Sequence, residues 1–461
     1  MPSLLSFSGR VFLLGFGPIG RSVLHLIDRF IPDISSLTII TREEISDNSI
    51  RKYPVTIKQQ NFTPDNVQSL LKDLSSGDLI FDTMFGFESR LVMEHAASCD
   101  SFYLNTSMEE WFESPYPSQA ALYEQVKPRK SGVTHCVDTG CNPGLITSFL
   151  KKSLVELGKR ALLKEDHRYT KLKSALQTVN VSELCRLLNI RTIHVSEADR
   201  QKPSVTFPKD SLINTWSVAS FLDEFLIEAE IVVGTHEKSL IKTLNSNLNN
   251  DTHPKWIPSP LFHRLSTLPY PFHCKSYNPN IGPFVGRLVR HPEILEFSRL
   301  CVSEDHSPTI AFVYSPIEEA WQSASLYEKI DKPSLNTQTI IVPKPDELIP
   351  TGFEAVGAFI ASETDGCWWY GSVLSTKEAA EFDKNSNATV LQVSSSILSA
   401  AKYALSNPNR GLLFPGDLDH DVILDYCRPY LGDVRSVFVS DWNEFSLDEL
   451  GVDYGSVNQI D

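Results

Sequence analysis

The sequence predicts an α/β protein in which a doubly wound parallel sheet precedes a second unit of α+β type. Near the start of the chain, the apolar residues 11–14 lead into three closely spaced glycines and then into apolar residues at helical spacing. This alternation of buried strand, turn and helix continues to about residue 150 and then fades. Such a rhythm is typical of parallel strands that are covered by helices on both faces of the sheet.

The turn after the first predicted strand has the sequence Gly-Phe-Gly-Pro-Ile-Gly, which matches the G-x-G-x-x-G pattern of Rossmann-type nucleotide-binding domains. The pattern provides a tight turn, a bare backbone beside the pyrophosphate and close packing of the helix on the strand. The alternative is a glycine turn that binds no nucleotide, but the strand before it and the helix after it favour binding. We therefore expect six consecutive residues to contact a dinucleotide: Gly15, Phe16, Gly17, Pro18, Ile19 and Gly20.

The second predicted strand, residues 37–40, ends in Thr41, Arg42 and Glu43. At this position an acidic side chain accepts hydrogen bonds from a ribose hydroxyl, whereas an arginine favours a 2′-phosphate. The sequence offers an arginine first and an acid one residue later, so the choice between NAD and NADP stays open at this strand. Thr41 and Arg42 are both candidate contacts of the nucleotide.

Later strands of the same sheet also end in polar residues. The strand within residues 76–86 ends at Asp82, and the strands within 101–111 and 134–154 lead into turns that contain Glu109 and Asn142. Since the carboxyl ends of parallel strands meet at one edge of a sheet, we expect these side chains to line the coenzyme cleft. The residues predicted to contact the coenzyme here are Asp82, Thr83, Asn105, Thr106 and Asn142.

A chain of 461 residues is too long for one ordinary core. We predict a dinucleotide-binding domain over residues 1–150 and a substrate domain of α+β type over residues 151–380. Residues 381–461 form a C-terminal segment whose predicted amphipathic helix, residues 386–408, is expected to pack back on the first domain.

Charge and composition exclude several classes of function. The net charge of −15 argues against a nucleic-acid partner and suits a cationic ligand, although on charge alone simple solubility is the favoured explanation. No apolar stretch reaches the roughly 18 residues of a membrane span, and no signal peptide is apparent, so we expect a cytoplasmic protein. The eight cysteines include no C-x-x-C pair and the histidines show no zinc-site spacing, so we expect no metal and no disulfide.

Three acids and a tryptophan of the second domain are candidate substrate contacts: Glu197, Trp216, Glu224 and Glu237. If they converge, they form a cage for an ammonium group, because carboxylates neutralise its charge and an indole face attracts cations. Taken singly, each is better explained as a solvated acid or a core tryptophan. The hypothesis therefore depends on their convergence.

Nine segments occur in the order and at the separations of a known family. They are GFGPIG, YLNTSMEEW, GCNPGL, IHVSEADRQ, NTWSV, AEIVVGTHE, VYSPIEEA, CWWYGSVLS and NATVLQVSSSILSA. Together they resemble bacterial homospermidine synthase, of the saccharopine dehydrogenase-like group, from about residue 10 to 445. The segments NTWSV, GCNPG and NATVLQVS are the most specific.

The resemblance implies a homodimeric enzyme with NAD as its coenzyme. In that family putrescine is oxidised and loses ammonia, a second diamine forms an imine, and the imine is reduced to a triamine. By motif, Glu197 and Glu224 resemble ammonium-binding carboxylates, and Trp216 resembles a cation–π residue. Glu109 and Asn142 match positions near the nicotinamide, Glu237 belongs to the Thr-His-Glu motif, and the other pocket residues implied are His291, a possible proton carrier, and Glu354.

The chain departs from the family at Val233-Gly234, where the family has Trp-Gly, and this leaves the chain length of the amine substrate undecided.

Two rival functions also stay open at this point. A saccharopine- or carboxynorspermidine-type reductase would use NADPH in a single reduction and would need an arginine clamp, for which Arg191 and Arg200 are the close candidates. A non-catalytic relative that only binds NAD is the second rival.

Overall fold

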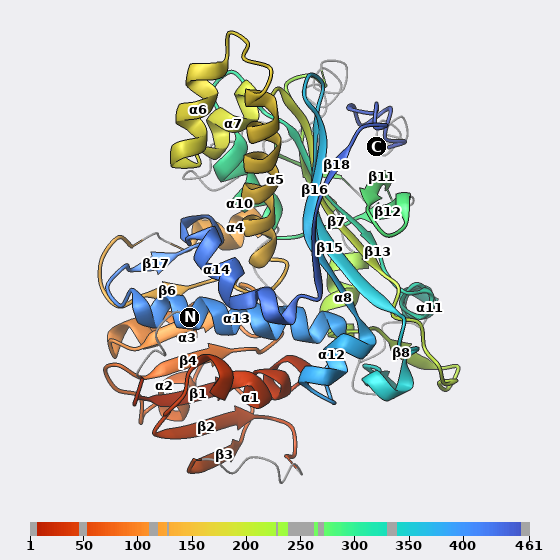
Figure 1. The fold of residues 1–461 in the computed structure, drawn as a ribbon. Helices are drawn as coiled ribbons and strands as arrows, with labels where there is room; N and C mark the ends of the chain where they lie inside the picture. The colour runs from red at the N-terminus through yellow and green to blue at the C-terminus, as the bar shows by residue number, and fades with distance from the viewer. Residues whose placement is uncertain are drawn as a thin grey trace, which may run out of the picture.

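The computed structural model describes residues 7–45, 53–109, 119–126, 129–226, 229–237, 262–265, 272–329 and 339–452. Within these residues the chain forms a seven-stranded sheet, a nine-stranded sheet and a small two-stranded sheet (Figure 1). The first sheet is parallel throughout, and the second is mixed. This arrangement confirms the predicted fold class.

The seven-stranded sheet has the strand order β17-β6-β5-β4-β1-β2-β3. Its central strands are buried on both faces, since alternate side chains of β1 belong to two different hydrophobic clusters, whereas the edge strand β3 has no fully buried residue. Helix α1 packs on one face, whereas α2 and α3 contribute to the cluster on the other. The bounds are β1 (Arg10–Leu14), β2 (Ser36–Thr41), β3 (Val55–Gln59), β4 (Leu79–Asp82), β5 (Phe102–Asn105), β6 (His135–Cys136), β17 (Leu412–Leu413), α1 (Pro18–Phe30), α2 (Val67–Leu70), α3 (Ser89–Ser98) and α4 (Gln119–Glu124).

The nine-stranded sheet carries β7 at its centre, paired in parallel with β13 and antiparallel with β15. One face packs against the long helix α5 (Figure 1), and the other face forms a separate cluster around Trp369. The strands are β7 (Ile190–Asp199), β9 (Ala229–Val232), β10 (Phe262–Leu265), β11 (His273–Asn278), β12 (Gly282–Leu288), β13 (Thr309–Ser315), β15 (Phe353–Ser362), β16 (Gly366–Ser375) and β18 (Asp433–Val439); β8 (Ser211–Ile213) and β14 (Thr339–Ile341) pair separately.

The helices that follow the first six strands begin with α5, which starts directly after the turn that contains Asn142. They are α5 (Leu145–Leu162), α6 (Tyr169–Thr178), α7 (Val181–Leu187), α8 (Val218–Leu226), α10 (Glu293–Cys301), α11 (Glu318–Lys329), α12 (Thr376–Phe382), α13 (Ala388–Ser406) and α14 (His420–Cys427), with short 3-10 turns η2 (Pro345–Glu347), η3 (Pro415–Asp417) and η4 (Arg428–Tyr430).

Helix α13 packs back on the nucleotide-binding half (Figure 1), as the sequence predicts. Its Ser394 hydroxyl hydrogen-bonds Ser22 of α1 at 2.7 Å, and its Ser396 hydroxyl donates to the carbonyl of Gly140 at 2.7 Å. The residues after α13 also contribute β17 to the first sheet and β18 to the second. The C-terminal residues therefore join both sheets; the exact domain boundaries stay a prediction.

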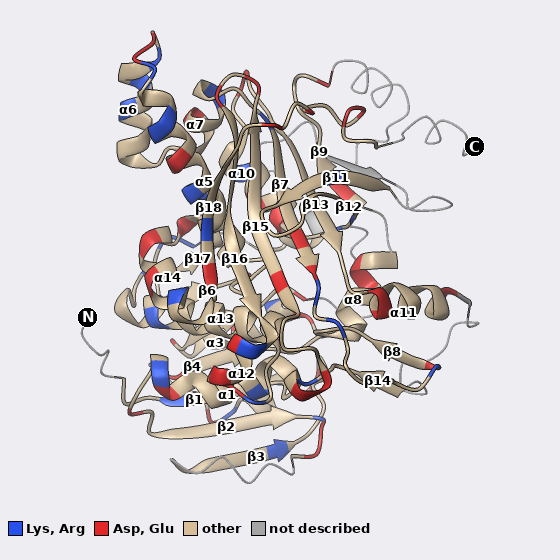
Figure 2. Cartoon of the chain, turned by 45° about the vertical axis from the view of Figure 1, so that its right-hand side comes forward, with Lys and Arg blue, Asp and Glu red and all other residues tan. Residues whose placement is uncertain are grey.

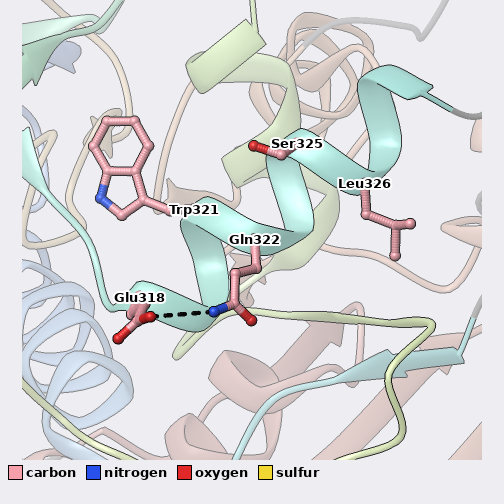
Figure 3. A pocket seen from close by; sticks show the side chains of 5 residues that line it. All are labelled: Glu318, Trp321, Gln322, Ser325 and Leu326. Atoms are coloured by element: carbon pink, nitrogen blue, oxygen red, sulfur yellow. Dashed lines mark hydrogen bonds between the residues drawn. The ribbon is translucent and has the colours of Figure 1, made fainter.

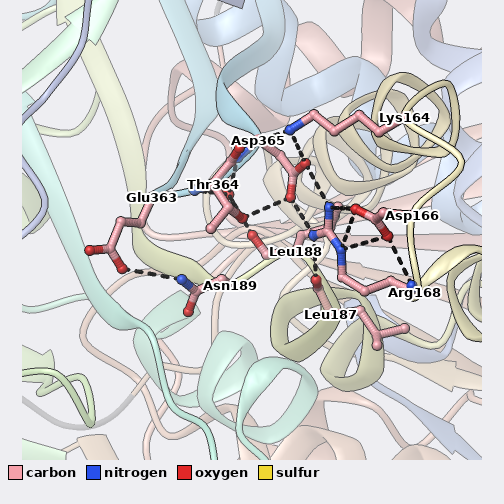
Figure 4. A network of polar contacts seen from close by, with 10 residues as sticks. Lys164, Asp166, Arg168, Leu187, Leu188, Asn189, Glu363, Thr364 and Asp365 are labelled. Atoms are coloured by element: carbon pink, nitrogen blue, oxygen red, sulfur yellow. Dashed lines mark hydrogen bonds and ion pairs between the residues drawn. The ribbon is translucent and has the colours of Figure 1, made fainter.

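An ion-pair network around the buried carboxylate of Asp365 fastens the helices α5 to α7 to the turn between β15 and β16 (Figure 4). The guanidinium of Arg168 donates to both carboxylate oxygens of Asp365, at 2.6 and 3.1 Å, and Lys164 adds a third hydrogen bond at 2.8 Å. Burial raises the pKa of Asp365, but these hydrogen bonds lower it by more, so the group stays ionised. The network fixes the end of the sheet opposite the predicted site.

Gly144 tests how tightly the turn before α5 is packed. Its φ is +133°, and a Cβ would lie 2.1 Å from the carbonyl oxygen of Gly140. We expect Gly144→Ala to lower the free energy of unfolding by about 3 kcal/mol or more, from strain and overpacking together. Gly77→Ala, at φ +82° with nothing within 4 Å of the new Cβ, is the matched control and should cost about 1 kcal/mol. Urea unfolding followed by circular dichroism measures both, and equal losses would contradict the steric argument.

Candidate active site

Four side chains form the centre of the candidate site, on the face of the second sheet that looks toward α5. Glu197 and Asp199 are two residues apart on β7, so both point to the same face. Register places Tyr314 of β13 opposite Glu197 and Glu354 of β15 opposite Asp199. The acidic positions on β7 and β15 are visible in Figure 2. Three carboxyl groups and a phenol thus share one small area of buried sheet.

Burial dominates the electrostatics of these carboxyl groups. It raises the pKa of Glu197 to about 8 and that of Asp199 above its usual range, while the pKa of Glu354 rises well above normal with the nearby Asp199 and Glu197 adding to the effect. Each group holds a proton more readily than an exposed acid does. A bound cation would favour the ionised forms, so the cluster has the electrostatic character of a site for an ammonium group.

The partners of Asp199 and Glu354 come from the ends of other elements. Thr215 donates to Asp199 at 2.5 Å, and the backbone N–H of Gln201 donates to the same carboxylate at 2.8 Å. Thr389, in the first turn of α13, donates to Oε2 of Glu354 at 3.4 Å. Asp199 and Glu354 also hydrogen-bond each other, and burial and this hydrogen bond both raise the pKa of Glu354, so one of the two carboxyl groups carries the proton between them.

Trp216 and Asn142 reach the cluster from two different directions. The half-buried indole of Trp216, between β8 and α8, donates from Nε1 to the Tyr314 hydroxyl at 3.3 Å. The amide of Asn142 donates to Oε2 of Glu197. Because Asn142 follows β6 of the first sheet, this hydrogen bond joins the predicted coenzyme cleft to the carboxylates of the second sheet.

A second acidic group surrounds His291, which is 3% exposed. Its Nε2 lies 3.5 Å from Oε1 of Glu224 on α8, and its Nδ1 hydrogen-bonds Glu293. Burial lowers the pKa of His291, but the two carboxylates raise it by more, so the net pKa lies well above normal. Glu109 belongs to the same group, because burial and the charges of Asp223 and Glu224 raise its pKa well above normal.

An aromatic layer supports both acidic groups. It runs from α11 through α8 and β13 to His291, with successive ring centroids 4.6, 4.8, 6.3, 6.0 and 4.8 Å apart: Trp321, Phe225, Phe221, Tyr314, Phe312 and His291. Rings at these separations interact favourably beyond their burial. The layer fixes α8, and with it Glu224, against the sheet.

Helix α11 also bounds a surface cavity of about 360 Å³ (Figure 3). Its lining comes from one helix, and two of its polar side chains, Glu318 and Gln322, hydrogen-bond each other at 3.3 Å. The cavity contains none of the predicted site residues. We therefore assign the chemistry to the buried groups and not to this cavity.

The structure does not bring Glu237 to the cluster. Its Oε1 accepts a hydrogen bond from the Thr309 hydroxyl at 3.1 Å and from the backbone N–H of Leu447 at 2.8 Å. Thr309 begins β13, whereas Tyr314 lies near the end of that strand. Glu237 therefore lies at the opposite end of the sheet, away from Tyr314 and Glu197, and a cage of Glu197, Trp216 and Glu224 stays a prediction.

The glycine turn has the geometry that a dinucleotide needs. Gly15 has φ +83° and donates to the carbonyl of Ile40 at 2.9 Å, and a Cβ on Gly20 would lie 2.5 Å from the Gly15 oxygen. A Cβ on Gly17 would meet nothing within 4 Å. Gly15 and Gly20 thus close the turn, while Gly17, before Pro18 and Ile19, leaves the N-terminus of α1 open to a pyrophosphate.

Three other residues predicted to contact the coenzyme, Thr83, Phe16 and Asp82, have partners within the first sheet and its helices. Thr83 donates to the Leu14 carbonyl at 2.9 Å and packs against the glycines, and Phe16 is buried beneath Arg21. Burial raises the pKa of Asp82 to about 6, although Tyr103 donates a hydrogen bond to it.

Asn105 and Thr106 support the turn that carries Asn142. The Asn105 side chain accepts from the backbone of Asp138 at 2.8 Å, and the Thr106 carbonyl accepts from Gly140 at 3.0 Å. Their role in the structure is to position that turn, whatever contact they make with a coenzyme.

At the end of β2, Thr41 accepts a hydrogen bond from the backbone of Glu43 at 3.1 Å, and Arg42 is exposed. Glu43 also lies 3.5 Å from a guanidinium nitrogen of Arg21, in the first turn of α1. An acid is thereby held beside the glycine turn, where the adenosine ribose is expected.

A possible cation cluster lies elsewhere, at Asp419, His420 and Asp421, whose ligand atoms are within 4.8 Å of one another. Asp419 caps α14 and Asp421 is ion-paired with Lys152, so both carboxylates already have partners. We keep the expectation that the protein holds no metal.

Asp199 and Tyr314 belong to the site but are absent from the sequence-based hypothesis. The signal for Asp199 is present in the strand HVSEAD, since an acid two residues after Glu197 must face the same side. No comparable signal exists for Tyr314, because its position depends on the pairing of β13 with β7.

Comparison with known proteins agrees with this geometry. Residues 11–136 match the family model described as saccharopine dehydrogenase NADP binding domain. The chain is 29% identical to homospermidine synthase of Blastochloris viridis over 461 residues, covering 94% of this chain and 92% of the relative. It is 26% identical to homospermidine synthase of Mesorhizobium japonicum over 459 residues, covering 94% and 91%.

Comparison with solved structures also shows similarity to a homospermidine synthase. The homospermidine synthase of Legionella pneumophila, determined in complex with NAD, superposes with a TM-score of 0.78 at 28% identity over 95% of this chain and 93% of that one. Saccharopine dehydrogenase of Saccharomyces cerevisiae shares the fold at a TM-score of 0.50 and 13% identity. The chain is thus a divergent relative of homospermidine synthase, similar over nearly its whole length, with a nucleotide-binding domain of the saccharopine dehydrogenase type.

Proposed function

We propose that this protein is a homospermidine synthase-like enzyme of polyamine biosynthesis that uses NAD. It transfers an aminoalkyl group from one diamine to the amine of another and releases ammonia. The observation that carries the proposal is the hydrogen bond from Asn142 to Glu197, which joins the coenzyme half of the site to the carboxylates. An amine held at Glu197 is therefore beside the turn that follows β6, at the carboxyl edge of the first sheet.

The nucleotide-binding residues fit NAD, because the open N-terminus of α1 suits a pyrophosphate and Glu43 suits a ribose hydroxyl. When bound, NAD accepts the hydride of the amine-bearing carbon and later returns it to the new carbon–nitrogen double bond. The protein's own part is to bind the two amines, orient them and move protons.

The carboxyl cluster binds the charged ends of the diamine. Glu197, Asp199 and Glu354 neutralise an ammonium group, and the indole face of Trp216 stabilises a cation at the reacting carbon. The phenol of Tyr314 orients the indole through their hydrogen bond. This assignment of roles follows from residue type and placement.

Proton transfer is assigned to Glu224 and His291. The attacking amine must lose a proton, and the departing ammonia must gain one. Burial raises the pKa of Glu224, and His291 opposes that shift, so the ion pair of Glu224 and His291 is placed to accept a proton from one amine and donate one to another. Glu109, whose pKa is also raised, lies in the field of Glu224 on the coenzyme side.

The contacts of Arg191 and Arg200 argue against a reductase that acts on a carboxylate-bearing substrate. Arg191 donates twice to Glu363, at 2.9 and 2.6 Å. Arg200 donates to the carbonyls of Asp199 and Ser315, at 2.6 and 3.0 Å. Both candidate clamps are occupied by the protein itself, whereas the site offers carboxylates, which favour a diamine.

For the diamine we propose putrescine, and for the assembly a homodimer in the cytoplasm, both by similarity to the family. None of the described helices is long and apolar enough to cross a membrane. The non-catalytic alternative is distinguished by the first experiment below.

The first prediction concerns product formation. With NAD and 1,4-diaminobutane, wild-type protein should yield ammonia and a triamine detected by mass spectrometry. Trp216→Leu should lose about 30-fold in rate, equivalent to about 2 kcal/mol of cation–π stabilisation in a desolvated site, and Glu224→Gln at least tenfold. Both should bind NAD normally.

Trp368→Leu is the matched control, since Trp368 is also half-buried and its indole also donates to a hydroxyl, that of Ser436. Its product rate should be unchanged. If wild-type protein binds NAD but converts no diamine, the non-catalytic alternative is correct.

The second prediction concerns the coenzyme. Gly17 has φ −70° and an open Cβ direction, so Gly17→Val should fold normally. The new side chain stands where the pyrophosphate approaches the helix, so the dissociation constant of NAD should rise at least tenfold. Isothermal titration calorimetry measures the affinity and a thermal melt checks the fold. Unchanged affinity in a folded variant would place the nucleotide elsewhere.

A further inference from the structure

Glu293 lies on the far side of the His291 ring from Glu224. The two nitrogens of the ring have different partners: Nδ1 hydrogen-bonds Oε2 of Glu293, and Nε2 lies 3.5 Å from Oε1 of Glu224. Glu293 is the first residue of α10 and is 1% exposed. The imidazole is thus held between an acid of the proposed substrate site and an acid that is fully inside the protein.

The surroundings of His291 are otherwise well defined. Phe312 of β13 packs edge-to-face on the ring, with centroids 4.8 Å apart. Glu197 of β7 also acts on it, since the charge of His291 lowers the pKa of that carboxyl. The neighbouring Arg290 is directed elsewhere, with Nε 3.6 Å from a carboxylate oxygen of Glu230. The charged groups facing His291 are therefore acids from α8, α10 and β7.

In the described part of the chain, the Glu293 carboxylate is paired at one oxygen only, the one that contacts His291. Within the described residues its Oε1 has no hydrogen-bond partner, so one side of a buried carboxylate is uncompensated. Burying such a group is costly unless it is balanced by an opposite charge. His291 is the cation in contact with it, and the position of Glu293 in the first turn of α10 adds the favourable field of the helix dipole.

We propose that Glu293 is a positioning residue: it fixes His291 with Nδ1 toward α10 and Nε2 toward Glu224, and it keeps the imidazole protonated while Glu224 stays ionised for an amine. This inference rests on the proposed function. Glu293 touches neither substrate nor coenzyme in this assignment. It acts through His291 by orienting the ring, in the way that a carboxylate behind a histidine sets its tautomer and charge.

The first test follows the charge of His291 without any substrate. In protein labelled with ¹⁵N-histidine, NMR gives the titration of His291, assigned by the loss of its signals in His291→Asn. Glu293→Gln, which keeps size and removes charge, should move the titration midpoint down by one pH unit or more, because burial then acts with less opposition. Glu293→Asp, which keeps the charge, should stay near wild type.

Glu296→Gln is the matched control. Glu296 lies on the same helix and is 9% exposed, but its carboxylate pairs with Arg299 at 2.7 and 2.8 Å. The His291 titration should be unchanged in this variant. An unchanged His291 midpoint in folded Glu293→Gln, or an equal shift in Glu296→Gln, would overturn the proposal.

The second test is the pH profile of diamine turnover. A histidine that must be protonated loses its function as pH rises through its pKa, so a lower pKa moves the alkaline limb of kcat/KM to lower pH. Glu293→Gln should show this movement, of one pH unit or more, with NAD affinity unchanged. An unmoved limb in an active enzyme overturns the inference, whereas a wild-type protein without turnover refutes the proposed function and leaves the NMR result to decide the role of Glu293.

Discussion

Carboxylates buried in a sheet must find either a proton or an opposite charge, and this requirement organises the second half of the molecule. Glu197, Asp199 and Glu354 occupy adjoining positions on two strands, and the pKa of each is raised because water is excluded. Hydrogen bonds from Thr215, Gln201 and Thr389 satisfy part of the cluster. A bound cation, such as the proposed diamine, would balance the charge of the ionised members.

The same requirement explains why the two sheets are joined where they are. Gln201 donates to Thr389 at 2.8 Å and accepts from the backbone of Ala388 at 2.8 Å, so the start of α13 is fixed beside the acids. Farther along, Ser396 of this helix holds the carbonyl of Gly140, in the turn that also presents Asn142. One helix therefore sets the distance between the amine end of the site and the coenzyme end.

The sequence predicts the parts of this arrangement that are local in the chain. The glycine turn, the strand ending at Asp82 and the helix over residues 386–408 are recognisable because each has its own hydrophobic period and its own turn or cap residues. The complete site cannot be predicted from local sequence patterns, because strand pairing and helix packing bring its residues together.

Glu237 stands in a motif that suggests chemistry, yet it pairs with Thr309 and Leu447 at the other end of the sheet. Tyr314 and Glu293 carry no local signal, since strand pairing and the packing of α10 bring them to the site. Strand β17 has two residues, too few for any period to appear.

The placement of the last two strands has a consequence for biosynthesis. β17 pairs with β6 at one edge of the first sheet, and β18 pairs with β16 in the second, although both follow α13 in the chain. The ribosome must therefore extend the polypeptide beyond residue 413 before the first sheet can acquire its last strand, and beyond residue 439 before the second sheet can do so. Until then the backbone groups of β6 and β16 stand open to pairing with other chains, so the nascent protein depends on being shielded from association late in its synthesis.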